Sequence, residues 1–201
     1  MPGEAETDPG FDATRDAPVS SAVVISGAGP SDERLVQALS AHFRVVWRSV
    51  RRFGVPQAHV DDAVQHVFAT LARKLDKITP GKERAFLLAT AARIAANARR
   101  TEQRAAREEH EVDTFEHPDP MPEELLEWKR RRELLDRLLD ALPHEQRTAF
   151  VLFELEGLSM IEISESLEIP MGTVASRLRR ARARFEAGAR AIRAQHQRGE
   201  R

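Results

Sequence analysis

Cysteine and tyrosine are absent from the 201-residue sequence, and aromatic residues make up only 5% of it. Without cysteine the chain has no disulfide framework, no thiolate metal site and no thiol nucleophile. No apolar run approaches the roughly 18 residues that a membrane span needs, and the acidic N-terminus lacks the basic start of a signal peptide. These absences predict a soluble, cytoplasmic protein that is not exported, not bound to a membrane and not a large β-sandwich.

Charge is present in both signs, with a formal net charge of -1 and a pI near 6.7. A near-neutral chain would argue against nucleic-acid binding if its charges were spread evenly. Here the arginines gather in helical segments, whereas acidic residues gather in the N-terminal stretch and in the run "EEHEVDTFEHPDPMP". The overall charge therefore does not exclude a DNA-binding surface.

Composition and periodicity divide the chain into five parts. Residues 1–30 are rich in Pro, Gly, Ser, Asp and Glu, which favours a disordered acidic tail. Apolar residues recur at helical spacing over 31–107 and again over 122–193, and no strand pattern competes with them. The acidic, proline-bearing run 108–121 between them has the composition of a linker, and 194–201 is a short C-terminal tail. We expect an all-α protein with two small helical domains.

Three helices are expected in the first domain. The first begins near Ser31 as N-cap, stops at "FGVP" and is followed by a helix from residue 60 to 75 and a third after the loop "DKITPGK". The apolar positions expected to face inward on the first helix are Leu35, Leu39, Phe43, Val46, Val50 and Phe53.

The second domain contains a short helix that stops at "EIPMG" and restarts as an arginine-rich helix. Gly157 suits the position that closes the preceding helix, and Ser159 with Glu162 has the spacing of a capping box. The short helix should bury Ile161, Ile163 or Leu167, and the next helix, from Thr173, should bury Val174 and Leu178. Two short helices joined by a tight turn form a helix-turn-helix, whose second helix fits the DNA major groove.

The pattern alone leaves a second interpretation open. Arginine-rich helix faces are often only solvated surface, and acidic residues at the start of a helix, such as Asp61 and Asp62, can simply complement the helix dipole. An isolated helix-turn-helix pattern therefore does not by itself establish DNA binding.

The stretch "LPHEQRTAFVLFELEGLSMIEISESLEIPMGTVASRLRRARARF" resembles region 4 of sigma factors, in the compact form of the extracytoplasmic-function (ECF) type. It departs from the family at Ser164, where alanine is usual, and at Ala175, where a polar residue is common. The resemblance implies contacts with the -35 promoter element by Gly172, Thr173, Ser176, Arg177, Arg179 and Arg180.

The first domain resembles region 2 of the same family. "VDDAVQHVFATLARKL" is similar to the helix that docks on RNA polymerase, which implies polymerase contacts by Asp61, Asp62, Gln65, Phe68 and Leu71. "ERAFLLATAARIAANARR" is similar to the segments that open the -10 element, and the loop 76–82 corresponds to one that captures a flipped-out base. The implied -10 contacts are Arg93, Asn97, Arg100, Lys77 and Lys82.

The resemblance implies a sigma factor that is a monomer when free and that binds core RNA polymerase, promoter DNA and an anti-sigma factor, without a cofactor or enzymatic activity. A stand-alone transcription regulator is the first alternative, but it would normally need a dimer to span two half-sites. An enzyme is the second, but the seven histidines share no metal-ligand spacing and no phosphate-binding glycine loop occurs. We therefore expect no metal site.

Overall fold

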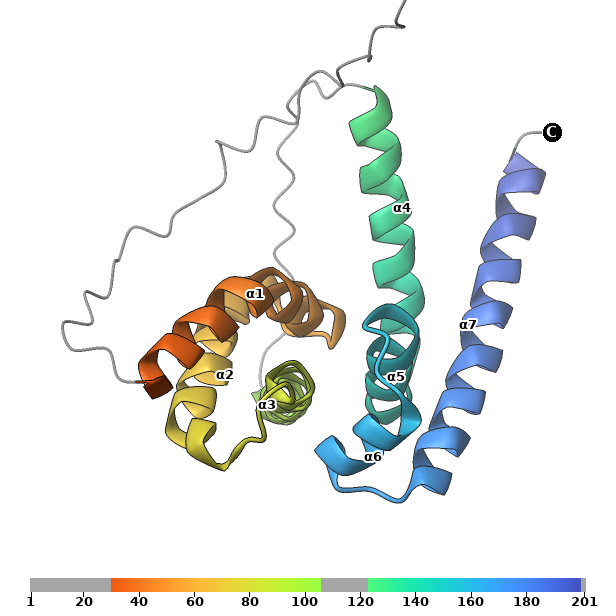
Figure 1. The fold of residues 1–201 in the computed structure, drawn as a ribbon. Coiled ribbons are helices and arrows are strands. Elements are labelled where there is room, and N and C mark those ends of the chain that lie inside the picture. Colours follow the sequence, from red (N-terminus) through yellow and green to blue (C-terminus); the bar gives the residue numbers. More distant parts are fainter. Residues whose placement is uncertain (1–29, 106–122, 200–201) are drawn as a thin grey trace, which may run out of the picture.

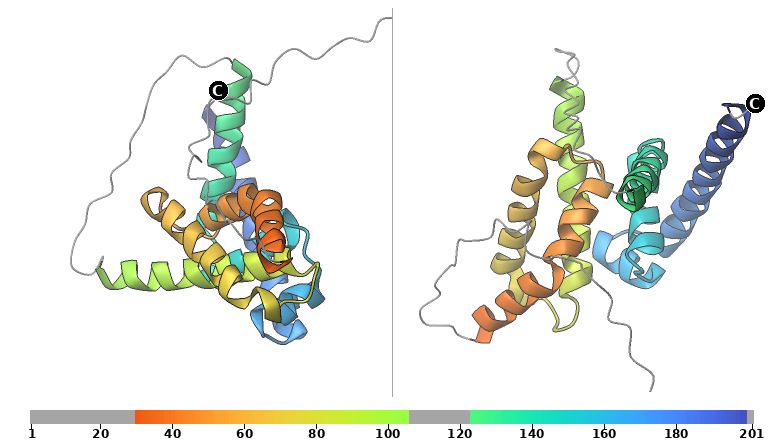
Figure 2. Two further views of the ribbon diagram at one scale, coloured as in Figure 1. Left: turned by 60° about the vertical axis from the view of Figure 1, so that its left-hand side comes forward. Right: turned by 90° about the horizontal axis from the view of Figure 1, so that it is seen from above.

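The computed structural model describes residues 30–105 and 123–199, and within these ranges the ordered elements are all helices. The described α-helices comprise three in the first half of the chain and four in the second. They form two bundles that lie side by side (Figures 1 and 2). The all-α prediction is confirmed. The tail expected before residue 30, the expected linker 108–121 and the side chain of Arg100 lie outside the described residues.

The first bundle consists of α1 (Pro30–Arg52), α2 (Val60–Lys74) and α3 (Glu83–Ala105), with short 3-10 turns at Gln57–His59 and Leu75–Lys77. Each helix contributes one apolar face to a common core, because its apolar residues recur every three or four positions. Its largest fully buried side chains are Val46, Val50, Phe53, Val60, Val67, Leu71, Leu87 and Leu88.

One apolar residue of α1 does not enter this core as expected. Phe43 is 39% exposed, and its ring stacks on that of Phe68 with the centroids 6.2 Å apart. Leu35 and Leu39 are only partly buried, whereas Val46 is fully buried. The inward prediction is therefore confirmed for the second half of α1 and is wrong for Phe43, which lies at the rim of the bundle.

The second bundle consists of α4 (Glu123–Asp140), α5 (His144–Phe150), α6 (Met160–Leu167) and α7 (Met171–Gly199). A π-helical turn, Val151–Leu155, continues α5. Gly157 follows the end of this turn with φ of 67°, the left-handed conformation that glycine adopts without a side-chain clash. The buried apolar residues shared by these helices include Leu139, Leu142, Leu152, Ile163, Val174 and Leu178.

The two bundles contact each other through buried charged groups. The side chain of Glu156, only 2% exposed, binds Arg52 of α1 with 3.0 Å between Nη1 and Oε1, and lies 3.5 Å from Nη2 of Arg84 of α3. Arg147 is 3% exposed; its Nε donates to the backbone carbonyl of Arg52 and its Nη1 donates to Asp140. Burial lowers the pKa of Arg147, and the neighbouring Asp140 carboxylate partly offsets that effect. Because a buried charge is costly when it loses its partner, Glu156 and Arg147 need these partners for as long as the bundles are docked.

Candidate nucleic-acid and polymerase interfaces

The start of α6 is held by the predicted capping box. Ser159 Oγ accepts from the Glu162 backbone N–H at 3.2 Å, and the Glu162 carboxylate accepts from the Ser159 N–H at 3.0 Å and from Ser159 Oγ at 2.8 Å. The hydrogen bonds from the Ser159 backbone and hydroxyl lower the pKa of Glu162. Two backbone N–H groups at the end of a short helix are thereby satisfied, so α6 has a fixed first turn.

The turn between α6 and α7 is fixed by backbone and side-chain hydrogen bonds. Glu168 adopts a left-handed φ of 58°, which reverses the chain after α6. Ser164 Oγ donates to the carbonyl of Ile169 at 2.7 Å, and the Pro170 carbonyl accepts from the Thr173 N–H at 2.8 Å. The serine that stands where the family usually has alanine thus ties α6 to the turn.

Buried residues on both sides of this turn set the angle of α7. Of the three apolar candidates in α6, Ile163 is fully buried and Leu167 is partly buried, whereas Ile161 is 60% exposed and does not belong to the core. Val174 and Leu178 are buried as predicted. Together these contacts confirm a helix-turn-helix, except that α7 begins at Met171, two residues before the predicted start.

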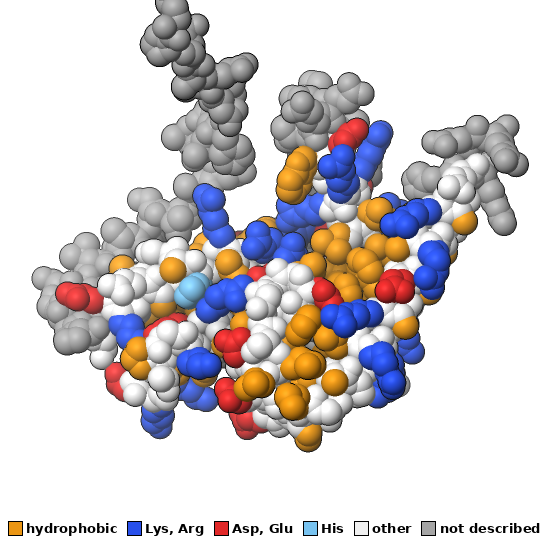
Figure 3. Space-filling model, turned by 45° about the vertical axis from the view of Figure 1, so that its right-hand side comes forward, with side chains coloured by type: hydrophobic (Ala, Val, Ile, Leu, Met, Phe, Trp, Pro, Cys, Tyr) orange, Lys and Arg blue, Asp and Glu red, His pale blue; other side chains and the backbone are white. Residues whose placement is uncertain are grey.

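The predicted -35 residues lie along the first three turns of α7. Gly172, Arg179 and Arg180 are exposed, and Thr173 and Ser176 are half-buried. Arg177 is only 23% exposed and forms an ion pair with Glu145 of α5 at 2.8 Å. Figure 3 shows Lys and Arg side chains along the edge of the molecule where α7 runs. The exposed cations of this helix can meet phosphates or base edges, whereas Arg177 also ties α7 to α5.

The predicted polymerase-binding residues of α2 fall into two groups. Asp61, Asp62 and Gln65 are exposed on one side of the helix, and Asp61 Oδ1 accepts from Trp47 Nε1 at 3.0 Å. Phe68 is 7% exposed and Leu71 is fully buried, so these two side chains belong to the core. Only the first three can be touched by another protein while the bundle stays folded.

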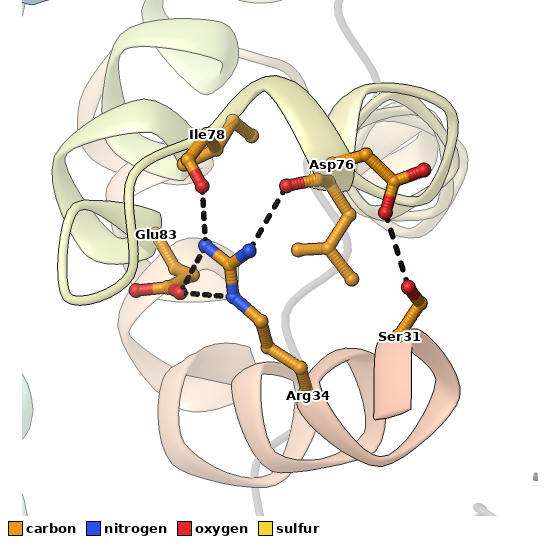
Figure 4. A network of polar contacts seen from close by, with 6 residues as sticks. Ser31, Arg34, Asp76, Ile78 and Glu83 are labelled. Atoms are coloured by element: carbon orange, nitrogen blue, oxygen red, sulfur yellow. Dashed lines mark hydrogen bonds and ion pairs between the residues drawn. The ribbon is translucent and has the colours of Figure 1, made fainter. Parts of the chain in front are cut away.

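The loop before α3 is held in shape by a residue that sequence reasoning missed. Arg34 of α1 donates to the carbonyl of Ile78 at 2.6 Å, to the carbonyl of Leu75 at 3.1 Å and to Glu83 at 2.7 Å (Figure 4). Burial raises the pKa of Glu83, but hydrogen bonds from its own backbone N–H and from Arg34 outweigh it and leave that pKa lowered. Arg34 lies more than 40 residues from the loop in sequence, so no local motif reveals the contact.

This fixed loop presents Lys77 and Lys82, two of the predicted -10 residues, in exposed positions. Ser31 Oγ adds a further hydrogen bond to the loop, donating to Asp76 Oδ1 at 3.0 Å. The loop therefore holds two exposed cations on a hydrogen-bonded backbone, and cations can follow the phosphates of a single nucleic-acid strand.

The remaining predicted -10 residues lie on α3. Asn97 is exposed. Arg93 is also exposed, but its Nη2 donates to the carbonyl of Ser166 and to Oε1 of Glu168, both at 2.8 Å and both in the second bundle. The structure thus brings a predicted -10 residue against the helix-turn-helix, which the sequence did not indicate.

Two family models match the parts of the chain that hold these surfaces. The model for sigma-70 region 2 matches residues 38–105, and the model for sigma-70 region 4 matches residues 132–185. The predicted domain limits, 31–107 and 122–193, enclose these matches.

Relatives of known name are also sigma factors. The ECF RNA polymerase sigma factor SigE of Mycolicibacterium smegmatis is 32% identical over 174 residues, which cover 86% of this chain and 63% of that protein. The chain thus spans less than two thirds of the length of that relative. The ECF RNA polymerase sigma-E factor of Escherichia coli K12 is 28% identical over 170 residues, covering 80% of this chain and 89% of the relative.

Solved structures give the same answer for the fold. CnrH, solved in complex with the cytosolic domain of CnrY, matches with a TM-score of 0.57 and 27% identity over 78% of this chain and 88% of that one. The sigma factor RpoE of Bartonella quintana, solved with the anti-sigma factor NepR, matches with a TM-score of 0.63 and 19% identity over 79% and 98% of the two chains. With a region 2 bundle, a region 4 helix-turn-helix and these relatives, the chain belongs to the ECF group of the sigma-70 family.

Proposed function

We propose that this protein directs promoter-specific initiation by core RNA polymerase, with its first bundle binding and opening the -10 element and its second bundle binding the -35 element. The observation that carries the proposal is the exposed pair Arg179 and Arg180 on α7, the second helix of a helix-turn-helix whose angle is fixed by buried Val174 and Leu178.

At the -35 element, α7 enters the major groove with its first turns toward the bases. Arg179 and Arg180 bind guanine edges or phosphates there, as arginine does in many such complexes. Gly172, Thr173 and Ser176 lie nearest the helix start, where the absence of a large side chain at Gly172 allows close approach to the DNA backbone. Arg177 acts in part through its ion pair with Glu145, which orients the helix.

At the -10 element, α3 and the loop before it hold one separated strand. Lys77 and Lys82 of the loop and Arg93 and Asn97 of α3 supply polar and cationic groups for this role. The frame made by Arg34 supports the proposal, because a loop that captures an unstacked base must keep its shape without the duplex. Phe86, near the start of α3, is partly buried and offers little surface for stacking, so cations carry more of this binding than stacking does.

Polymerase binding is assigned to Asp61, Asp62 and Gln65, the exposed residues of the α2 segment. Phe68 and Leu71 support this surface from inside the core. The solved complexes of CnrH with CnrY and of RpoE with NepR support an anti-sigma factor as a further partner of this chain.

The test is run-off transcription with core RNA polymerase on a library of promoter fragments, with wild type and with Asp61→Lys/Asp62→Lys. We expect transcripts that depend on the protein, and loss of both transcription and polymerase co-elution in the variant. Glu127→Lys/Glu133→Lys, which changes two exposed acids of α4, is the control with the same change of charge. A protein that shifts duplex DNA alone and never joins polymerase would instead be a stand-alone regulator.

A further inference from the structure

The face that we assign to the -10 strand is the face of the first bundle that packs on the second. A cleft between them is lined on one side by Ile78, Thr79, Lys82, Ala85 and Phe86, and on the other by Glu162, Glu165 and Ser166 of α6. Next to this cleft, Arg93 binds Glu168 and the Ser166 carbonyl. The first helix of the helix-turn-helix therefore lies against part of the loop and part of α3.

The covering surface carries a row of acidic residues. Glu162, Glu165 and Glu168 recur at every third position, which places them along one side of α6 and its C-cap. The first two line the cleft, and the third forms the ion pair with Arg93 at 2.8 Å. The charges of Lys82 and Arg84 also act on the Glu162 carboxylate, after the larger effect of its bonds with Ser159. Cations assigned to DNA thus face carboxylates where phosphates would lie.

We propose that the acidic row of α6 (Glu162, Glu165 and Glu168) is an internal competitor of the -10 strand, which keeps the free protein closed until promoter DNA and polymerase separate its two bundles. The proposal deepens the function proposed above and depends on it for the role of α3 and the loop. Closure itself depends only on the contacts between the bundles.

Distance makes the closed form incompatible with simultaneous binding of both promoter elements. The two elements lie roughly 25 base pairs apart, or about 85 Å along a duplex with a rise of roughly 3.4 Å per pair. In the closed form, atoms of Arg93 and Glu168 lie 2.8 Å apart. The sequence holds 17 residues between Ala105 and Glu123, and a fully extended chain of that length reaches about 60 Å. The covalent connection therefore permits the bundles to separate.

The ion pair between the acidic row and α3 is weak enough for the two bundles to separate and dock again. Arg93 is 45% exposed and Glu168 is 79% exposed, and such surface pairs each shift an equilibrium by roughly 1.5- to 5-fold. The better buried pairing of Glu156 with Arg52 and Arg84 lies at the other end of α6 and is not part of the acidic row. Removing charge from the row should thus loosen the closed form without unfolding either bundle.

The absence of cysteine allows a direct measurement of closure. Ala72→Cys on α2 and Ala183→Cys on α7 are exposed, and spin labels there report the distance between the bundles in the full chain. We expect one main narrow distance distribution for the parent, and a longer, broader population that grows by roughly 1.5- to 5-fold in Glu165→Gln/Glu168→Gln. Glu162 is left intact because it caps α6. Glu33→Gln/Glu133→Gln, which removes two exposed acids elsewhere, should leave the distribution unchanged.

A second readout asks whether the row competes with DNA. The same variants are titrated with random 20-nucleotide single-stranded DNA, and Glu165→Gln/Glu168→Gln should bind at least threefold tighter than the control of equal net charge. Three results would overturn the proposal. The first is a parent whose distance distribution is already broad and long, and the second is an equal shift of distance in Glu165→Gln/Glu168→Gln and in Glu33→Gln/Glu133→Gln. The third is equal affinity of these two double variants for the single-stranded DNA. If the distance between the bundles increases in Glu165→Gln/Glu168→Gln but polymerase never initiates transcription with the protein, the closed form is supported and the proposed function is wrong.

Discussion

The two surfaces assigned to DNA differ in what the other bundle places opposite them: Arg179 and Arg180 of the helix-turn-helix are exposed, whereas Lys82 and Arg93 of the first bundle face α6 and its C-cap. Arg179 and Arg180 are exposed on α7, and Arg93 is bound to Glu168. All four side chains are cations, so the difference comes from the carboxylates that α6 and its C-cap place near Lys82 and Arg93. Availability of a site in this protein is therefore a property of how its two bundles are docked.

The largest effect on this difference should come from removing the cations around Glu156. In Arg52→Ala/Arg84→Ala, a carboxylate that is 2% exposed loses both arginines. Leaving a buried charge without its partner costs about 3–5 kcal/mol, a cost that vanishes when the bundles separate and water reaches Glu156. We expect the spin-label distance between Ala72→Cys and Ala183→Cys to become long and broad, with helicity by circular dichroism unchanged.

The matched control for this variant is Arg73→Ala/Arg137→Ala, which removes two exposed arginines, one from each bundle. It should keep the parent distance. An unchanged distance in Arg52→Ala/Arg84→Ala would show that apolar packing, and not the charged contacts, holds the bundles together.

The second-largest effect is expected from the exposed arginines of α7. Arg179→Ala/Arg180→Ala should lower affinity of the polymerase complex for a promoter fragment containing the -35 element by more than tenfold, because each good base contact contributes about 1–3 kcal/mol. The distance between the bundles should not change, since Arg179 and Arg180 lie on the exposed side of α7 and Arg180 bonds to Ser176 of the same helix. Filter binding at fixed salt measures the affinity.

Arg190→Ala/Arg193→Ala is the control on the same helix, with the same change of charge and beyond the first turns. Equal losses in the two double variants would mean that α7 attracts DNA only through its total charge.

Features that depend on neighbours in sequence were predicted well. The capping box of Ser159 and Glu162 and the left-handed Gly157 follow from short-range backbone requirements. The burial of Val174 and Leu178 follows from helical periodicity in the same way. These local rules hold wherever the helix lies in the molecule.

Features that depend on distant segments could not be predicted. Phe43 and Ile161 have the right spacing for the core, but Phe43 is 39% exposed and Ile161 is 60% exposed, because no distant segment covers them fully. Arg34 reaches a loop more than 40 residues away, and Arg93 pairs with a residue 75 positions later. Periodicity identifies the polar face of a helix, but it does not say what packs on that face.

A smaller effect is expected at the end of α1, where the two bundles meet. Gly54 has φ of 93°, and a Cβ there would lie 2.9 Å from Nη1 of Arg147. Gly54→Ala should lower the free energy of unfolding by about 1–2 kcal/mol, mainly through backbone strain, because the arginine end can move. Gly172→Ala, at a glycine with no positive φ and open space around it, should not destabilise the protein. Urea unfolding compares the two, and equal stabilities would rule out strain at Gly54.

The smallest effect that we expect is a pH-dependent loss of stability in the second bundle, at the cap of α6. Ser159→Ala removes the helix cap, which contributes about 1 kcal/mol at neutral pH. Because the folded pKa of Glu162 lies below its ordinary value of 4.5, its contribution is complete above that value and is lost as the pH falls through the folded pKa. The stability difference between wild type and Ser159→Ala should therefore shrink as the pH falls below 4.5 and through the folded pKa of Glu162. The stability difference should not vanish, since Ser159 Oγ of the wild type still accepts from the Glu162 N–H.

The control is Ser40→Ala, which removes a hydroxyl that donates to the Val36 carbonyl within α1. Its effect on stability should not depend on pH in this range. The same pH dependence in Ser40→Ala would mean that acid acts on the whole protein and not on the α6 cap.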